Sequence, residues 1–208
     1  MPSPHSLILF LAAGLALNFT PGPDMLYVAA RGASEGRSAG IVSALGIGAG
    51  TLVHITLVAL GLAALLSAVP IAYTVVRIGG ALYLIYLGVR AFGRQSFLAT
   101  GPLEPASLGT IFRQGVITNV LNPKVALFFL AFLPQFVDPS RGNPVMQIVA
   151  LGLLFDTTGT LVNLAVALGS SGAAARLRGD GRVGTLLQKA TGVLFIGLGL
   201  RLAFAARR

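Results

Sequence analysis

Six apolar runs of membrane-spanning length fill most of this 208-residue chain. A run of about 20 apolar residues crosses the hydrocarbon core of a bilayer. The runs therefore predict an all-α integral membrane protein with about six transmembrane helices. A re-entrant hairpin over 7–20 is the alternative, and it would leave five full spans. The runs lie near 6–30, 40–66, 71–92, 114–137, 145–170 and 186–205.

The amino-acid composition leaves little material for a water-facing surface. Charged residues make up 10% of the chain, against about 25% in soluble domains. Only short loops separate the apolar runs, so we expect one transmembrane domain over residues 1–208, with the lipid bilayer as its solvent. No Lys or Arg precedes the first run, which a cleaved signal peptide normally requires. We therefore expect that run to be retained as the first helix.

The net charge of +9 carries a topology signal. The basic residues flank apolar runs and are not interleaved with aromatic residues, so we expect no nucleic-acid partner. Loops rich in Lys and Arg stay in the cytoplasm, which predicts an inner-membrane protein with both termini outside. Arg141, Arg207 and Arg208 run against this orientation. The residues that support it are Arg31 and Arg37 after the first run, Arg90, Arg94 and Arg113 after the third, and Arg176, Arg178 and Arg182 after the fifth.

Several kinds of chemistry find no support in the residue content. The chain has no Cys, which removes disulfides and thiolate metal sites. Its two His and six acidic residues are dispersed, so we expect no metal site and no cofactor. No nucleophile and base stand together near one end of the runs, so we expect no enzyme.

Two of the apolar runs are interrupted by proline beside polar residues, at 18–24 and at 119–124. Proline removes a backbone donor and frees the carbonyl four residues earlier. Such irregular backbone is tolerated at membrane depth where it is buried in protein or lines a water-filled cavity. The helical rise puts the two breaks at a similar, slightly cytoplasmic depth. The site residues predicted at these breaks are Asn18, Thr20, Pro21, Gly22, Pro23, Asp24, Asn119, Asn122, Pro123 and Lys124.

The interrupted runs open the two halves of the chain, about 1–92 and 107–208. Three spans in each half give the halves opposite orientations, which is the layout of a 3+3 inverted repeat. Transporters of this layout bind substrate between broken helices at the repeat interface. Two unrelated proline kinks remain the alternative. In the second run, Gly46 and Gly50 have the GxxxG spacing, which predicts close packing of helices.

The chain resembles the LysE/RhtB family of amino-acid exporters. The segments that carry the resemblance are NFTPGPDMLYVAARGASEGRSAGIVSALGIGAG from residue 18, RIGGALYLIYLGVR from residue 77 and NVLNPKVALFFLAFLPQFV from residue 119. The later spans match mainly in hydropathy and length. The resemblance implies six spans, export of amino acids or close analogues, and coupling to the proton gradient. It does not indicate which amino acid is exported.

Five ionisable residues are expected inside the spans, where charge is costly and functional roles are common. Asp24 follows the first break and can couple protons, bind a substrate ammonium or cap the half-helix. His54 can relay protons or form an interhelical hydrogen bond. Arg77 can clamp a carboxylate or extend to the outer interface. Lys124 can pair with Asp24 or extend inward. Asp156 can serve the pathway or a buried polar cluster, because it shares one helical face with Thr160 and Asn163.

Together these features favour a secondary exporter that binds an amino acid between the breaks and exchanges it for protons. The alternative is an exporter of an inorganic cation or another small solute. A cation site would need more oxygen ligands than the two acidic residues inside the spans supply. A structural membrane subunit is a further alternative, for which disrupting both breaks would affect assembly and leave solute flux unchanged. The apolar and glycine-rich faces permit a homodimer.

Overall fold

A computed structural model describes residues 2–68 and 104–170, together with scattered residues between 78 and 92 and between 189 and 204. All elements assigned in these ranges are helical. Arg77 and most of the third and sixth predicted spans lie outside the described residues, as does the loop at 176–182. The four other predicted spans are described over nearly their whole length.

The first half begins with a broken helix. α1 (Pro4–Phe19) starts where Ser3 accepts a hydrogen bond from the Ser6 amide, and α2 (Pro23–Glu35) starts at Pro23. The pair bends by 47° at the break. Gly36 then turns the chain into α3 (Arg37–Ala68) with a φ of 90°, a conformation that glycine adopts without strain.

The second half repeats this pattern. Ser107 accepts a hydrogen bond from the Thr110 amide at the start of α5 (Leu108–Val120). After a 46° bend, the chain continues as α6 (Pro123–Leu127), the π-helix η1 (Phe128–Phe132) and the 3-10 helix η2 (Leu133–Phe136). The short η3 (Pro139–Arg141) leads into α7 (Pro144–Ser170).

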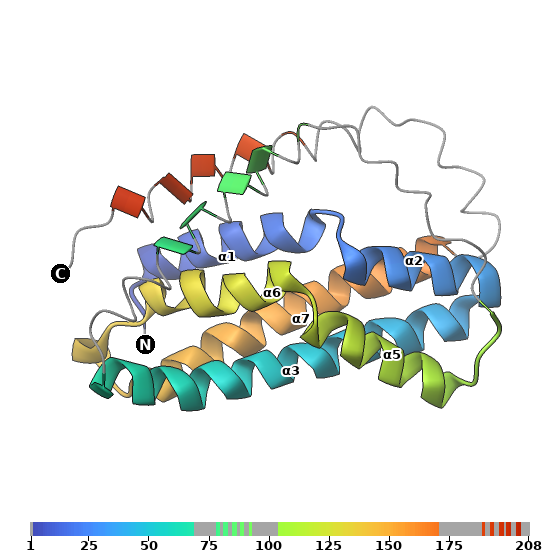
Figure 1. Cartoon of the computed structure of the whole chain (residues 1–208), viewed down its shortest axis with the longest axis horizontal. Helices are drawn as coiled ribbons and strands as arrows, with labels where there is room; N and C mark the ends of the chain where they lie inside the picture. Colours follow the sequence, from blue (N-terminus) through green and yellow to red (C-terminus); the bar gives the residue numbers. More distant parts are fainter. Residues whose placement is uncertain are drawn as a thin grey trace.

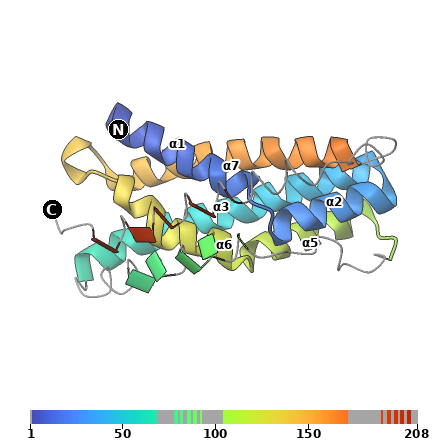
Figure 2. The same ribbon diagram turned by 90° about the horizontal axis from the view of Figure 1, so that it is seen from above.

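The two broken helices run in opposite directions (Figures 1 and 2). In Figure 1, α1 and α2 run from left to right, whereas α5 and α6 return from right to left. α3 packs mainly against α5 and α7. α3 and α7 also run in opposite directions. This arrangement of corresponding elements is the one expected for the first two spans of each half of an inverted repeat.

The described helices suit a membrane. α3 and α7 are each long and apolar enough to cross one, and each bent pair makes a further span, for up to four. Large apolar side chains point outward along them, including Ile8, Leu60 and Leu161, which are 60–70% exposed. The prediction of an all-α membrane protein is confirmed. α1 is one uninterrupted helix, so the alternative of a hairpin over 7–20 is wrong.

Close backbone contact between α3 and α5 depends on glycine. A Cβ at Gly46 would lie 2.4 Å from the Phe112 carbonyl oxygen, and one at Gly50 would lie 2.7 Å from Asn119 Cβ. Gly115 makes the reciprocal approach to the Ser43 carbonyl, at 2.9 Å. The predicted packing role of the GxxxG spacing is confirmed, because any larger residue would push the two helices apart.

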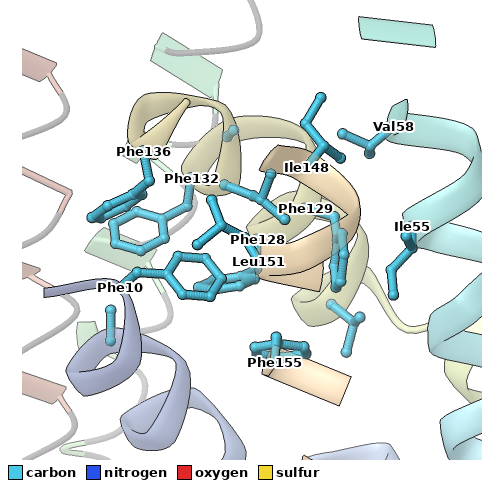
Figure 3. Packing of buried hydrophobic residues seen from close by; sticks show 14 of the residues in the cluster. Phe10, Ile55, Val58, Phe128, Phe129, Phe132, Phe136, Ile148, Leu151 and Phe155 are labelled. Carbon is cyan, nitrogen blue, oxygen red and sulfur yellow. The ribbon is translucent and has the colours of Figure 1, made fainter. Parts of the chain in front are cut away.

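One end of the bundle is filled by phenylalanine rings, which we call the aromatic cluster (Figure 3). Phe128 is its centre, with ring centroids 4.6 Å from Phe155 and 5.1 Å from Phe132. The rings come from α1, η1, η2 and α7, so the cluster joins both broken helices to α7. Its members are Phe10, Phe128, Phe129, Phe132, Phe136 and Phe155.

Candidate substrate site

The first break disturbs the helical hydrogen bonds of the backbone carbonyls before it. The Leu17 carbonyl would normally accept from the residue four positions later, which is Pro21 and has no N–H. Thr20 has extended backbone angles at the C-terminal end of α1, so its carbonyl also leaves the helical pattern. The Thr20 hydroxyl satisfies the Ala16 carbonyl at 2.7 Å. The Leu17 carbonyl accepts from the Thr20 amide at 3.1 Å instead. Both it and the Thr20 carbonyl therefore have room for a donor from another part of the chain.

Lys124 of the second break supplies those donors. Its Nζ donates to the Thr20 carbonyl at 2.9 Å and to the Leu17 carbonyl at 3.2 Å. Gly22 makes room for the ammonium, because a Cβ there would lie 3.0 Å from Nζ. No salt bridge joins the Lys124 ammonium to Asp24, although both residues line the same pocket, so the predicted counter-ion role across the cavity stays a prediction. Main-chain carbonyls at a helix C-terminus take the place of the carboxylate.

Asn119 makes the return contact from the second break to the first. Its Nδ2 donates to Asp24 Oδ2 at 2.9 Å, and Thr51 Oγ1 lies 3.4 Å from its Oδ1. Asp24 accepts this bond in the first turn of α2, whose N-cap is Gly22, so Asp24 is not the helix cap. Asp24 is buried, and its second oxygen, Oδ1, has no hydrogen-bond partner. An unpaired buried carboxylate oxygen is costly, which marks it as a place for a proton or a ligand.

His54 and Asn122 hold the second break in shape. His54 Nε2 lies 3.1 Å from the Asn119 carbonyl oxygen, and its ring stacks on Phe129. A carbonyl can only accept, so Nε2 carries the proton here. This interhelical bond is the structural alternative predicted for His54. Asn122 caps α6 by accepting from the Lys124 amide, and Pro123 follows as the first helical residue.

A polar pocket lies where the two breaks meet α3 and α7. Its cavity volume of about 20 Å³ has room for ordered water but not for an amino acid. An amino acid would need a wider pocket than this one, and we call this narrow form of the site its closed state. Its lining consists of Asn18, Asp24, Met25, Ile47, Thr51, Asn119, Lys124, Val125, Phe155, Asp156, Gly159, Thr160 and Asn163.

α7 contributes the polar face expected from its spacing. Asp156, Thr160 and Asn163 all line the pocket, and Thr160 Oγ1 lies 3.4 Å from Asp156 Oδ1. From α1, Asn18 Nδ2 donates to Thr158 Oγ1 at 3.0 Å and to the Phe155 carbonyl at 3.3 Å. Asn18 thus ties the first break to α7 and forms part of the same wall.

The structure gathers some of the predicted site residues and separates others. Asn18, Asp24, Asn119, Lys124 and Asp156 line the pocket. The other described residues of the predicted site shape or support the breaks without belonging to this lining: they are Thr20, Pro21, Gly22, Pro23, His54, Asn122 and Pro123.

Sequence reasoning missed Thr51 and the apolar part of the lining. Thr51 lies one helical turn before His54 on an otherwise apolar run, and this spacing could have predicted that Thr51 faces the site. Met25, Ile47, Val125 and Phe155 are apolar residues in apolar helices, and nothing in their local sequence sets them apart.

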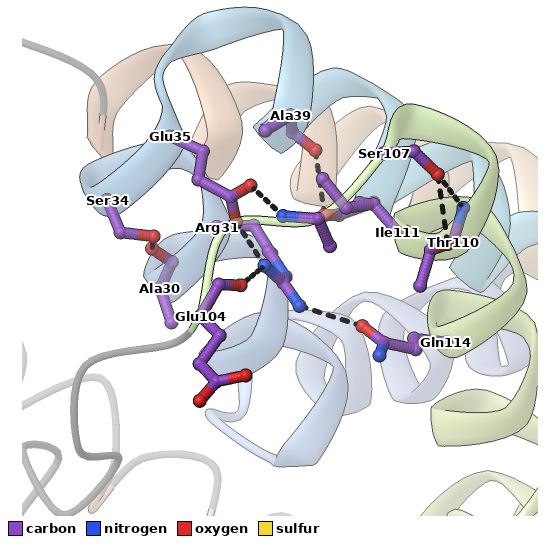
Figure 4. Close-up of polar contacts among 12 residues, drawn as sticks. Ala30, Arg31, Ser34, Glu35, Ala39, Glu104, Ser107, Thr110, Ile111 and Gln114 are labelled. Atoms are coloured by element: carbon purple, nitrogen blue, oxygen red, sulfur yellow. Dashed lines mark hydrogen bonds and ion pairs between the residues drawn. The ribbon is translucent and has the colours of Figure 1, made fainter.

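The other end of the bundle is joined by polar contacts, which we call the Arg31 network (Figure 4). Arg31 is buried inside α2 instead of lying beyond the first span, as predicted. It forms an ion pair with Glu35 and donates to the Glu104 main-chain carbonyl at 2.9 Å and to Gln114 Oε1 at 2.8 Å. Tyr27 donates to the Ile111 carbonyl at 2.8 Å. The network ties α2 to the start of the second half.

Comparisons with known proteins place this chain in a family. A sequence model described as LysE type translocator matches residues 15–206. The chain belongs to the LysE-type translocator family. This makes it a multi-pass membrane transporter rather than an enzyme, with a small molecule as its substrate. No solved structure matches the chain.

Individual relatives match over nearly their full length. The chain is 32% identical over 191 residues to an uncharacterized membrane protein of Pseudomonas aeruginosa, covering 89% of this chain and 88% of that protein. It is 28% identical over 198 residues to a leucine efflux protein of an Enterobacter strain, covering 93% of each. A leucine efflux protein of Klebsiella pneumoniae is 26% identical over 200 residues, covering 94% of this chain and 93% of that protein.

Proposed function

We propose that this chain exports an amino acid or a close analogue across the inner membrane in exchange for protons, with the substrate bound in the pocket between the breaks. The observation that carries the proposal is the joining of the two breaks around one pocket that contains Asp24, Lys124 and Asp156. The names of the leucine efflux relatives support an amino acid as the cargo.

The pocket has the chemistry that a zwitterion requires. The unpaired Oδ1 of Asp24 offers an acceptor for a substrate ammonium, and Asp156 lines the same pocket. The N-terminal ends of α2 and α6 favour a carboxylate because a helix N-terminus carries partial positive charge. Met25, Ile47 and Val125 provide an apolar wall for an aliphatic side chain.

Proton exchange would use the carboxylates of the pocket. A proton that binds Asp24 from outside removes the charge that holds the substrate ammonium, which favours release outward. Loss of that proton to the cytoplasm restores the charge for the next substrate. The pocket must widen for entry and release, which we assign to alternating access between the two halves.

The test is uptake of labelled amino acids into inside-out vesicles with and without an imposed proton gradient. We expect gradient-dependent uptake by the wild type and its loss in Asp24→Asn. Asp138→Asn is the matched control, because Asp138 lies in the loop before α7 outside the pocket, and it should transport normally. Retention of gradient-driven uptake in Asp24→Asn would remove the coupling role, and uptake of no amino acid by the wild type would remove the proposed cargo.

A further inference from the structure

The position of the Lys124 side chain does not stabilise its own helix. It is the second residue of α6, where a positive charge meets the positive end of the helix dipole. Its ammonium lies instead at the C-terminal end of α1, where the dipole is negative, on the carbonyls of Leu17 and Thr20. The contact therefore stabilises the junction between the two breaks and not the helix to which Lys124 belongs.

The surroundings of the ammonium are those of a small cation site. Two main-chain carbonyls bind it directly, and the side chains of Asp24 and Asp156 line the same pocket. Freed carbonyls of broken helices and nearby carboxylates are the ligands that transporters offer to coupling metal ions. Here a lysine from the other half of the chain reaches the same kind of ligands.

We propose that the Lys124 ammonium is a tethered cation that occupies, at the first break, the place a free metal ion would take. It holds the two breaks together in the closed state and leaves the Leu17 and Thr20 carbonyls when the pocket opens. Its assignment to the transport cycle rests on the proposed function, whereas its binding at the carbonyls does not.

The experiment measures thermal unfolding of the purified full-length chain in detergent, in sodium, potassium or choline chloride at equal ionic strength. Lys124→Ala leaves the carbonyls and the acids without their cation and opens space for an ion. We expect sodium or potassium to raise its melting temperature by about 3–6 °C over choline, at ten times the dissociation constant. Wild type should show no difference among the three salts.

Two further variants sharpen the result. Lys124→Met keeps the stem and fills the space without a charge, so it should gain nothing from metal cations. Lys189→Ala removes the same charge at an exposed position and should behave as wild type. The tethered cation is refuted if folded Lys124→Ala responds equally to the three salts, or if wild type gains the same stabilisation from sodium or potassium.

A transport measurement on the wild type covers the case in which Lys124→Ala does not fold. Export through a site with its own cation should be unchanged when all sodium and potassium are replaced by choline. A requirement for either metal ion overturns the proposal. If no amino acid is transported at all, the proposed function fails, while the melting temperatures still decide whether Lys124 replaces a metal ion.

Discussion

The two ends of the pocket are closed by different kinds of contact. On the side of the α7 N-terminus, the aromatic cluster packs rings against each other, and Phe155 belongs both to that cluster and to the pocket wall. On the other side, Arg31 lies about 10 Å along α2 from Asp24 and makes directional bonds to the second half.

This difference bears on which end opens first. Separated rings lose their dispersion contacts and gain nothing in return. The polar groups of the Arg31 network exchange their partners for water when they separate, so their net loss is smaller. We therefore expect the Arg31 end, which the positively charged loops predict to be cytoplasmic, to open at lower cost.

Phe128→Ala should remove the centre of the aromatic cluster. Phe128 is 2% exposed and contacts the rings of Phe10, Phe132 and Phe155. A cavity of this size costs about 3–5 kcal/mol of unfolding free energy, measured by denaturation in detergent. Leu130→Ala is the control, because Leu130 belongs to the same π-helix but is 47% exposed, and it should change stability little. Equal losses in both variants would mean that the rings have no special role.

Arg31→Met should weaken the polar end, because it removes the charged donor that Glu35, Gln114 and the Glu104 carbonyl share. Hydrogen bonds to charged groups contribute about 1.5–3 kcal/mol, so the pocket should become at least about ten times more accessible from that end. The chain has no cysteine, so Thr160→Cys places a single thiol in the pocket. Its modification rate by an impermeant thiol reagent, applied from each side, measures the accessibility.

The matched control for this experiment is Arg113→Met. Arg113 is exposed on α5, so its loss removes the same charge without breaking the network. Faster modification from the Arg31 side in Arg31→Met alone would support the comparison. Faster modification from the side of the aromatic cluster would reverse it.

The sequence predicted the architecture of the site better than its contacts. Proline rules located both breaks, because Pro21 and Pro123 cannot donate within a helix. Helical spacing placed Asp156 and Thr160 on one pocket wall. The burial of Arg31 was not predicted, because an arginine after an apolar run normally stays in water. Its ion pair with Glu35 and its contacts with Glu104 and Gln114 of the second half explain the burial.

The hydrogen-bond partners of Lys124 were not predicted, for a related reason. Charge pairing favours a carboxylate, and Asp24 is the nearest one along the first break. The lysine instead binds main-chain carbonyls more than a hundred positions away in the sequence. Carbonyls have no side-chain signature, so only the folded backbone reveals them as ligands.

Gly46→Ala should separate α3 from α5 on the side of the pocket where the Arg31 network lies. The new Cβ would meet the Phe112 carbonyl oxygen at 2.4 Å, which forces a backbone shift and costs about 1–3 kcal/mol. Gly61→Ala is the control, because nothing lies within 4 Å of its Cβ position, and it should stabilise the helix by about 0.5–1 kcal/mol. Unfolding in detergent measures both. If Gly46→Ala leaves the free energy of unfolding unchanged, the two helices can separate without cost.

The smallest effect should come from Asp138, in the loop beside the aromatic cluster. Hydrogen bonds from the Ser140 hydroxyl and amide, with Arg141 nearby, hold the pKa of this carboxyl below its ordinary value. A lowered pKa means that the ionised group adds stability above the pKa of the unfolded chain and loses it as the pH falls through the folded-state pKa. The advantage of wild type over Asp138→Asn should therefore shrink between about pH 5 and pH 3.

Melting temperatures of the two proteins across this pH range measure that advantage. The group is exposed and water screens its charge, so we expect a difference far smaller than the loss in Phe128→Ala. A growing advantage of wild type on acidification would contradict the sign of the pKa shift. A loss as large as that of Phe128→Ala would mean that charge in the loop, and not ring packing, closes this end, and the contrast between the two ends would no longer hold.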